Sequence, residues 1–311
     1  MKFKMKDLGA ANYILGIKIT RDRKRKLLSI SQKLYIENIL ARFNMLNADP
    51  VGSPMDPHVK LSKGVDSISN MENEELRLIP YQSAIGAVMY LMLGTRPDLA
   101  FTVTFLSQFN NNYRQEHWTA VKRLLRYIKG TSEWELTYGL NDSGLIGYCD
   151  ADYADDVATR RSFTGYVFML NGGAVSWQAK KQTTVTLSTA EAEYLAQTEA
   201  VKEGLWWKQF IGELDLDCVD SNTIQLYGDN QAAIALTKNP EFHQRTKHID
   251  IRHHFIREHV NNGDIKLDYI NTDGMIADVL TKPLAKNAHM KLSRSMGLQS
   301  NSTLSGSVGS Q

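Results

Sequence analysis

The chain has 311 residues, of which 42% are hydrophobic, and this is enough for two domains with ordinary cores. Its longest apolar runs fall well short of the roughly 20 residues that a membrane span needs, its basic opening lacks a signal core, and its two cysteines cannot build a disulfide framework. We therefore expect an intracellular protein without a membrane partner, in a cytoplasmic or nuclear compartment that the sequence does not distinguish.

Charge is distributed unevenly along the chain, although the net value is only +2. Residues 1–140 carry 20 Lys and Arg against 13 Asp and Glu, whereas residues 141–311 carry 16 against 21. A basic half suits contact with a phosphate backbone, and an acidic half with clustered carboxylates suits divalent cations. Ordinary variation between two domains explains these counts equally well.

Residues 13–31 are predicted to form a β-hairpin, because apolar residues alternate with smaller or polar ones on both sides of the turn RDRKRK. The exposed tip of this hairpin would carry five basic residues and one acid. A helical pattern follows from Ser31 to Phe43 and ends before a polar loop that starts at Pro50 and extends to about Ile79.

The next region is predicted to be helical and partly basic. One helix starts near Tyr81, breaks at residues 95–97 and resumes as far as Phe109, and another runs from about Gln115 to Lys129. The basic side chains of the last helix fit a solvated face better than a track for nucleic acid.

From Leu145 the pattern changes to strands. Three β-patterned runs, the last two joined by a turn at Gly172 and Gly173, predict an antiparallel meander, and a long helix follows from Ser188 to about Leu214. A strand, a helix, a His/Arg-rich helix over residues 249–260, a strand and a final helix from about Met275 complete the order. This alternation indicates an α/β fold, and the polar tail after it is predicted to be disordered.

Four acidic residues occupy positions where α/β sheets usually carry their chemistry, at strand ends and on helices that cross the sheet. Asp150 ends the first strand of the meander, and Asp229 ends the fourth strand. Glu193 lies in the first turns of the long helix, and Asp278 in the first turn of the final helix. These four acids can converge on one point and are the candidate catalytic and metal-binding residues.

Helix capping distinguishes Glu193 from its neighbour Glu191. Ser188 and Glu191 have the spacing of a capping box, in which the serine caps the helix and the glutamate bonds back to the cap amide. Glu193 instead shares a face with Ala196 and Ala200, small residues typical of a helix that lies close on a sheet. A charge on such a face needs a partner, and a metal ion is a suitable one.

Ordered motifs in the second half of the chain read YCDADYADD, RRSFTGYVFML, SWQAKKQ, LSTAEAEYLA, YGDNQAAIAL, RTKHIDIRHHFIRE and MIADVLTKPL. The first half contains FKMKDLG, YILGIKI, QKLYIENILARFNM, YQSAIGAVMYLMLGTRPDLAF and HWTAVKRLLRYIKGT. The first set resembles the RNase H domain of copia-type retrotransposon Pol polyproteins, over about residues 142–290. The second set is similar to the end of the reverse transcriptase and its connection in the same family, so the resemblance covers nearly the whole chain except the tail.

The resemblance implies an α/β fold of the RNase H-like kind, a mixed five-stranded sheet with flanking helices. A mostly helical region similar to the thumb and connection of reverse transcriptase would precede it, with a β-hairpin at its N-terminus. The expected domains are a remnant of the reverse transcriptase palm and thumb (1–60), a helical thumb or connection region (61–141), the RNase H domain (142–290) and a disordered tail (291–311).

The resemblance further implies an endonuclease that hydrolyses the RNA strand of RNA–DNA hybrids, with the upstream polymerase region of the same polyprotein as a further partner. The family's metal-binding carboxylates correspond by position to Asp150, Glu193, Asp229 and Asp278. Carboxylates are the hard ligands that Mg²⁺ prefers, and two such ions, or Mn²⁺ in their place, activate a water and stabilise the leaving oxygen. Asp150 would bridge the ions, with Glu193 and Asp229 on one and Asp278 on the other.

One motif is set aside: residues 153–156 spell the Y-x-D-D of a reverse transcriptase active site. They lie inside the RNase H-like segment and lack the apolar strand on each side that a palm hairpin requires. In the family the polymerase aspartates precede FKMKDLG, so DNA synthesis by this chain alone is not expected.

Other residues are weaker candidates. The loop NTDGM before the final helix lacks the histidine that many cellular RNases H carry there, so this group either works without one or turns over slowly. Trp206 and Trp207 are interpreted as core and edge residues rather than as a stacking platform for bases. Ordinary exposed or capping roles, with substrate contact as the alternative, are expected for His243, His248, His253, His254 and His259.

Two other functions compete with a nuclease. A decayed retroelement could leave a catalytically silent fragment that binds nucleic acid through its basic half. A transposase or integrase nuclease on the same fold is the other alternative, and the segments similar to reverse transcriptase count against it.

Overall fold

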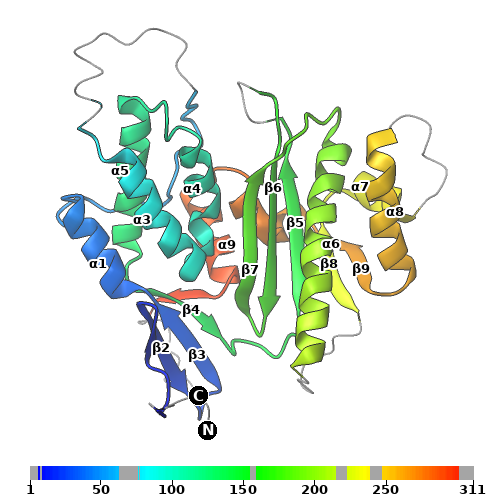
Figure 1. Cartoon of the computed structure of the whole chain (residues 1–311), viewed down its shortest axis with the longest axis horizontal. Coiled ribbons are helices and arrows are strands. Elements are labelled where there is room, and N and C mark those ends of the chain that lie inside the picture. Colours follow the sequence, from blue (N-terminus) through cyan, green and yellow to red (C-terminus); the bar gives the residue numbers. More distant parts are fainter. Residues whose placement is uncertain are drawn as a thin grey trace.

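Two five-stranded sheets and their covering helices form the computed structural model, which describes residues 6–7, 9–62, 76, 78–154, 159–214, 223–238 and 247–300 (Figure 1). The first sheet is antiparallel throughout and has the order β1-β2-β3-β4-β10. Its strands are β1 (Tyr13–Ile14), β2 (Ile17–Asp22), β3 (Leu27–Ser31), β4 (Trp134–Tyr138) and β10 (Leu298–Ser300). This sheet therefore joins segments that are far apart in the sequence.

The second sheet has the order β7-β6-β5-β8-β9 and carries the predicted strand-end acids. Its strands are β5 (Ile146–Asp152), β6 (Phe163–Leu170), β7 (Gly173–Lys181), β8 (Ile224–Gly228) and β9 (Ile265–Tyr269). The first three are antiparallel neighbours, whereas β8 runs parallel to β5, and β9 runs parallel to β8. This mixed five-stranded sheet with flanking helices confirms the predicted RNase H-like α/β fold class.

The helices form two groups that flank the second sheet (Figure 1). The first group consists of α1 (Lys33–Arg42), α3 (Tyr81–Gly94), η1 (Pro97–Leu99), α4 (Ala100–Ser107) and α5 (Gln115–Gly130). The second group consists of α6 (Thr189–Glu213), α7 (Gln231–Lys238) and α8 (Lys247–Asn261). After β9 the chain forms η2 (Thr272–Gly274), η3 (Ile276–Leu280) and α9 (Lys286–Ser295). Among the described ranges, no helix is long and apolar enough to cross a membrane.

Local sequence explains where these helices end. α3 stops at Gly94 because Pro97 has no amide hydrogen and restricts the residue before it, so the predicted break at residues 95–97 is confirmed. α5 buries Val121 and Ile128 on one face and leaves its basic side chains on the others, as its periodicity predicts.

The largest group of buried apolar residues extends from the first helical group into the second sheet. Leu125 of α5, Phe101 of α4, Phe163 of β6 and Leu280 of η3 all belong to it. The rings of Phe101 and Phe163 pack edge to face with centroids 5.2 Å apart. The domain limits at residues 60 and 141 stay predictions, and the core itself is continuous across both.

A buried ion pair connects η1 with α5 and α9. Arg96 and Asp98 are at most 1% exposed, and Arg96 Nη2 lies 2.8 Å from Asp98 Oδ2. The Tyr127 hydroxyl donates to the same oxygen at 2.7 Å, and His289 Nε2 of α9 lies 3.1 Å from that hydroxyl. Burial lowers the pKa of His289 to about 4, so its ring is neutral at pH 7. The cluster fixes how α9 packs against the first helical group.

The C-terminal segment corrects the prediction of a disordered tail over residues 291–311. Residues up to Ser295 belong to α9, and Leu298–Ser300 pair with β4. Met296 is fully buried and Leu298 is 1% exposed, so hydrophobic burial holds a segment that is too short to show periodicity in the sequence. Residues 301–311 lie outside the described residues.

Two further elements differ from the sequence predictions. β4 was not expected, because its five residues gain their structure by pairing with β3 and β10. The single final helix from about Met275 is instead the short η3 followed by α9. Pro283 separates the two, because a proline inside a helix removes a hydrogen bond and clashes with the preceding turn.

Truncation after Ser295 should lower the free energy of unfolding by roughly 3 kcal/mol or more, because it removes the buried side chains of Met296 and Leu298. Truncation after Ser300 retains both and is the matched control. Urea unfolding of the two shortened proteins measures the difference. Equal stabilities would contradict the docking of β10.

Candidate active site

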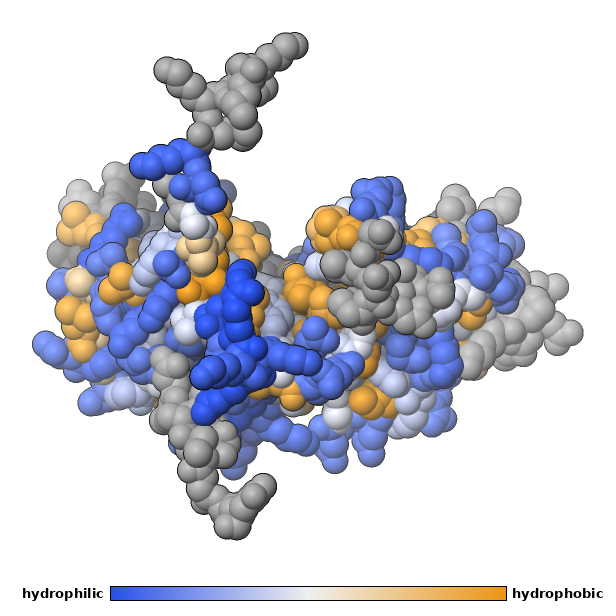
Figure 2. Space-filling model, turned by 90° about the horizontal axis from the view of Figure 1, so that it is seen from below, coloured by the Kyte–Doolittle hydropathy of each residue, from blue (hydrophilic) through white to orange (hydrophobic). Residues whose placement is uncertain are grey.

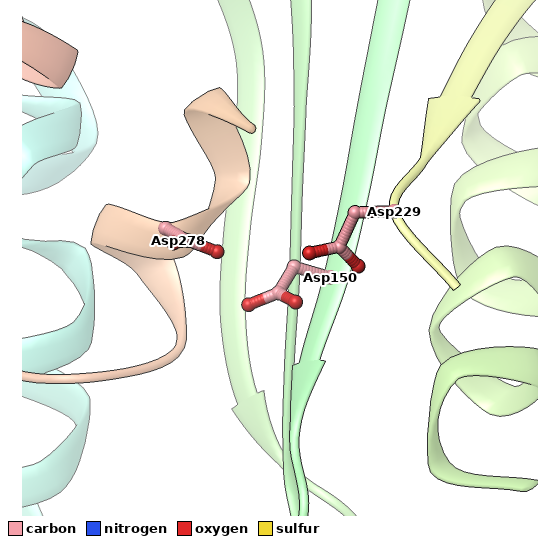
Figure 3. Close-up of side chains that lie close together, drawn as sticks. All are labelled: Asp150, Asp229 and Asp278. Atoms are coloured by element: carbon pink, nitrogen blue, oxygen red, sulfur yellow. The ribbon is translucent and has the colours of Figure 1, made fainter. Parts of the chain in front are cut away.

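Three of the four predicted acids gather where β5 and β8 end. Asp150, Asp229 and Asp278, here called the aspartate cluster, each contribute a carboxylate oxygen, and these oxygens lie within 4.8 Å of one another. Figure 3 shows the three carboxylates pointing toward one another from β5, from the residue after β8 and from η3. Asp150 is 2% exposed and Asp278 is 7% exposed, whereas Asp229 is half-buried.

The parallel pairing of β5 with β8 brings the first two aspartates together. Tyr148 is paired with Tyr227, and Asp150 and Asp229 each follow two residues later. Residues two apart in a strand lie on the same face, and neighbouring strands are about 4.8 Å apart. The register therefore places the two carboxylates side by side.

A glycine in β6 allows η3 to bring in the third aspartate. Gly165 is paired with Asp150, and a Cβ on Gly165 would lie only 2.7 Å from Thr281 Cγ2 and 2.8 Å from Leu280 Cβ. Any larger residue at this position would push the η3 segment away from the sheet. Asp278 therefore reaches the site from the first turn of the 3-10 helix η3, and not from the final α-helix, which begins only at Lys286.

Glu193 lies beside the aspartate cluster and is not one of the three acids that compose it. It is 6% exposed on α6, and the backbone amide of Ala151 donates a hydrogen bond to its carboxylate. Its Oε2 has no hydrogen-bond partner among the described residues. The charges of Asp150 and Asp229 nevertheless raise the pKa of Glu193, so Glu193 belongs to the same electrostatic site.

Burial and mutual repulsion raise the pKa of three of these acids. Burial raises the pKa of Glu193 far above its usual value, and the charges of Asp150 and Asp229 raise it further. Burial and Asp150 raise the pKa of Asp278, and the same two causes raise that of Asp229. The site therefore favours bound cations or protons.

Lys282 supplies one cation, which the sequence analysis did not identify. Its Nζ lies 3.0 Å from Asp278 Oδ1 and 3.7 Å from Asp150 Oδ2. Burial alone would lower the pKa of this amine, but the two carboxylates outweigh that effect and raise it. Its position four residues after Asp278, within the motif MIADVLTKPL, was the available sequence signal.

Two threonines orient the aspartates, and the sequence analysis missed these as well. The Thr281 hydroxyl donates to Asp150 Oδ2, and the Thr272 hydroxyl donates to Asp229 Oδ2 at 2.9 Å. Each hydrogen bond fixes one oxygen of the carboxylate that it contacts.

The donor set fits a divalent cation. Carboxylate oxygens are the hard ligands that Mg²⁺ and Mn²⁺ favour, and the oxygens of the aspartate cluster are close enough to share an ion. Glu193 adds a buried acceptor without a partner. One ammonium group, that of Lys282, does not balance four carboxyl groups, so further positive charge would relieve their repulsion.

The distinction between Glu191 and Glu193 is supported by the cap of α6. Ser188 Oγ accepts a hydrogen bond from the Glu191 amide at 3.2 Å. Glu191 Oε2 accepts from the Leu187 amide at 2.7 Å, one residue earlier than the cap amide that the capping box predicts. Glu191 therefore has a structural role at the start of the helix.

The remaining candidates lie outside the aspartate cluster. Tyr153 and Ala154 form a turn after β5, while Asp155 and Asp156 of the Y-x-D-D sequence lie outside the described residues. His259 Nδ1 is paired with Asp264 Oδ2 at 2.8 Å. Trp206 is 52% exposed and stacks on Phe210, so it is an edge residue and not a core residue. Outside the described side chains lie His243, His248 and His253.

Comparison with known proteins places the chain among transposon proteins, although no protein-family model matches it. It is 47% identical over 299 residues to the retrovirus-related Pol polyprotein from transposon TNT 1-94 of Nicotiana tabacum, covering 96% of this chain and 22% of that protein. It is 36% identical over 300 residues to the Pol polyprotein from transposon RE2 of Arabidopsis thaliana, covering 96% and 20%. The chain thus spans about a fifth of the length of these relatives.

The strand order and the converging acids define the chain as a protein with an RNase H-like fold. Among solved structures it is similar to the N-terminal RNase H domain of a Mycobacterium tuberculosis protein, with 10% identity, a TM-score of 0.32, and coverage of 49% of this chain and 97% of that one. The chain belongs to the family of copia-type retrotransposon Pol polyproteins, as its motifs predicted.

Replacing Glu193 by Gln should stabilise the metal-free protein increasingly as the pH rises from 5 to 8. The pKa of Glu193 is raised on folding, so the folded parent retains a proton that the unfolded chain releases above about pH 4.3, and its stability falls with rising pH. We expect the stability difference to grow by roughly 2 kcal/mol, as measured by urea unfolding with a chelator. Parallel pH profiles of the two proteins would contradict the buried, repelled state of Glu193.

Glu191→Gln should lower the free energy of unfolding by roughly 1 kcal/mol or less and leave the metal affinity of the site unchanged, because Glu191 acts only at the helix cap. Thermal unfolding with and without Mg²⁺ measures both properties. A loss of Mg²⁺ stabilisation at unchanged stability without the metal would transfer the metal-binding role from Glu193 to Glu191.

Proposed function

We propose that this chain is an RNase H-type endonuclease that hydrolyses the RNA strand of RNA–DNA hybrids with two Mg²⁺ ions, which Mn²⁺ can replace. The observation that carries this proposal is the aspartate cluster, whose oxygens lie within 4.8 Å of one another at the ends of β5 and β8. Membership of the Pol polyprotein family supports it.

Each residue of the site has a distinct part in this proposal. Asp150 lies between Asp229 and Asp278 (Figure 3) and would bridge the ions, with Asp278 on one of them and Asp229 and Glu193 on the other. The bound cations would supply an activated water and stabilise charge on the leaving oxygen. Lys282 keeps its proton, holds Asp278 and Asp150 in place, and offsets part of their charge.

The partners are also proposals. RNA selectivity would come from hydrogen bonds to the 2′-hydroxyl groups and from the shape of the hybrid's minor groove. The upstream polymerase region of the same polyprotein is the second partner. Its support is that the relatives are polyproteins of which this chain spans about a fifth.

One observation favours a second function, binding of nucleic acid without cleavage. The tip of the β2–β3 hairpin exposes Arg21, Arg23, Lys24, Arg25 and Lys26. When the molecule of Figure 1 is seen from below, the centre of the visible face is strongly hydrophilic (Figure 2). Such a tip can contact phosphates without any catalytic group.

Purified protein should cut a labelled RNA–DNA hybrid in the presence of Mg²⁺. Asp150→Asn should reduce the rate at least about a hundredfold, because it removes the charge at the centre of the aspartate cluster. Asp142→Asn changes an exposed acid in a loop before β5 and is the matched control, with the rate of the parent expected.

Cleavage products resolved on a denaturing gel, together with hybrid binding followed on a native gel, decide between the two functions. Binding of the hybrid without cleavage by the parent supports the silent fragment and excludes the nuclease. Equal cleavage by the parent and Asp150→Asn would show that the activity arises elsewhere.

A further inference from the structure

Gln197 is a buried amide that the proposed mechanism does not use. It lies on α6 one helical turn after Glu193 and is 0% exposed. Neither its Nε2 nor its Oε1 has a hydrogen-bond partner among the described residues, and the same holds for Glu193 Oε2. An unsatisfied buried polar group is costly and rare in folded proteins, so such a pair calls for an explanation.

The location of Gln197 connects it with the acids. Its Nε2 lies 3.4 Å from where a Cβ on Gly228 would stand, and that same point lies 4.0 Å from Cys149 Sγ. Gly228 directly precedes Asp229, and Cys149 directly precedes Asp150. The side chain of Gln197 therefore extends from α6 toward the ends of β5 and β8, next to the residues that directly precede Asp150 and Asp229.

The neighbouring Thr198 shows how a buried polar side chain is normally satisfied on this helix. It is 1% exposed, and its hydroxyl donates to the Tyr194 carbonyl oxygen at 2.9 Å. Gln197 makes no comparable bond to its own helix. Residues four apart on a helix are neighbours, so Gln197 shares a face of α6 with Glu193, whose Oε2 also lacks a partner among the described residues.

We propose that Gln197 is a positioning residue for Glu193. Its amide Nε2 donates a hydrogen bond to a bridging water that in turn donates to Glu193 Oε2, while the Ala151 amide holds the carboxylate from the backbone. A carboxylate held at both oxygens needs less ordering when a cation binds. The contact itself is independent of the activity, whereas its role in metal binding rests on the proposed function.

A double-mutant cycle tests the contact in the full chain with a chelator present. Urea unfolding is measured for Gln197→Met, Glu193→Met and the double variant, which keep the side-chain volume and remove the polar atoms. Each substitution changes the unfolding constant by some factor. The factor for the double variant should differ at least about fivefold from the product of the factors for the two single variants. Glu193→Gln replaces the methionine variant if the latter does not fold.

Thr198→Val, combined with Glu193→Met, provides the matched control cycle. Thr198 is equally buried on the same helix but bonds to its own backbone, so its effects should multiply within about twofold. Purely multiplicative effects in the Gln197 cycle, or equal coupling in both cycles, would overturn the proposal.

Metal dependence tests the positioning role. Gln197→Met should raise the Mg²⁺ concentration for half-maximal hybrid cleavage about tenfold, with the rate at saturating Mg²⁺ within about threefold of the parent. A Mn²⁺ titration followed by thermal stability should show the same shift without requiring cleavage, and Thr198→Val should show neither.

The outcomes separate the two proposals. An unchanged metal dependence of Gln197→Met overturns the positioning role even if the cycle shows coupling. A parent protein that shows coupling but neither binds Mn²⁺ nor cuts the hybrid overturns the proposed function and reduces Gln197 to a structural contact.

Discussion

Repulsion among buried carboxylates is the constraint on which the arrangement of this molecule depends. Burial and neighbouring charge raise the pKa of Glu193, Asp229 and Asp278, so in the absence of cations these groups repel one another. The scaffold must therefore impose their positions. The parallel register of β5 and β8 places Asp150 and Asp229, while a long helix and a 3-10 turn deliver the other two.

The 3-10 turn is the least regular of these elements and has the most support from outside the second sheet. Leu280 packs into the core that the first helical group shares with β6. The buried Arg96–Asp98 pair reaches α9 through Tyr127 and His289 and so secures the segment that follows the turn. The helices that precede the sheet in sequence thus help to hold Asp278 at the site.

The parts of the site that local patterns determine could be predicted from sequence. Strand alternation placed Asp150 and Asp229 at strand ends, and the spacing of Ser188 and Glu191 identified the helix cap. The offset of Glu193 from the aspartate cluster, and the contacts of Lys282 with two acids, depend on elements that meet only after folding. The strands β4 and β10 were not predicted for the same reason, because β4 gains its structure by pairing with β3 and β10, and β10 has only three residues.

The order in which the first sheet can form has consequences for folding. β4 lies between β3, which begins at residue 27, and β10, which ends at residue 300. Contacts between residues so far apart in sequence form slowly. A nascent chain cannot complete the first sheet until β10 has left the ribosome. Until then one side of Trp134–Tyr138 remains an open strand edge, which is a template for pairing with other chains, so aggregation during synthesis competes with folding at this strand.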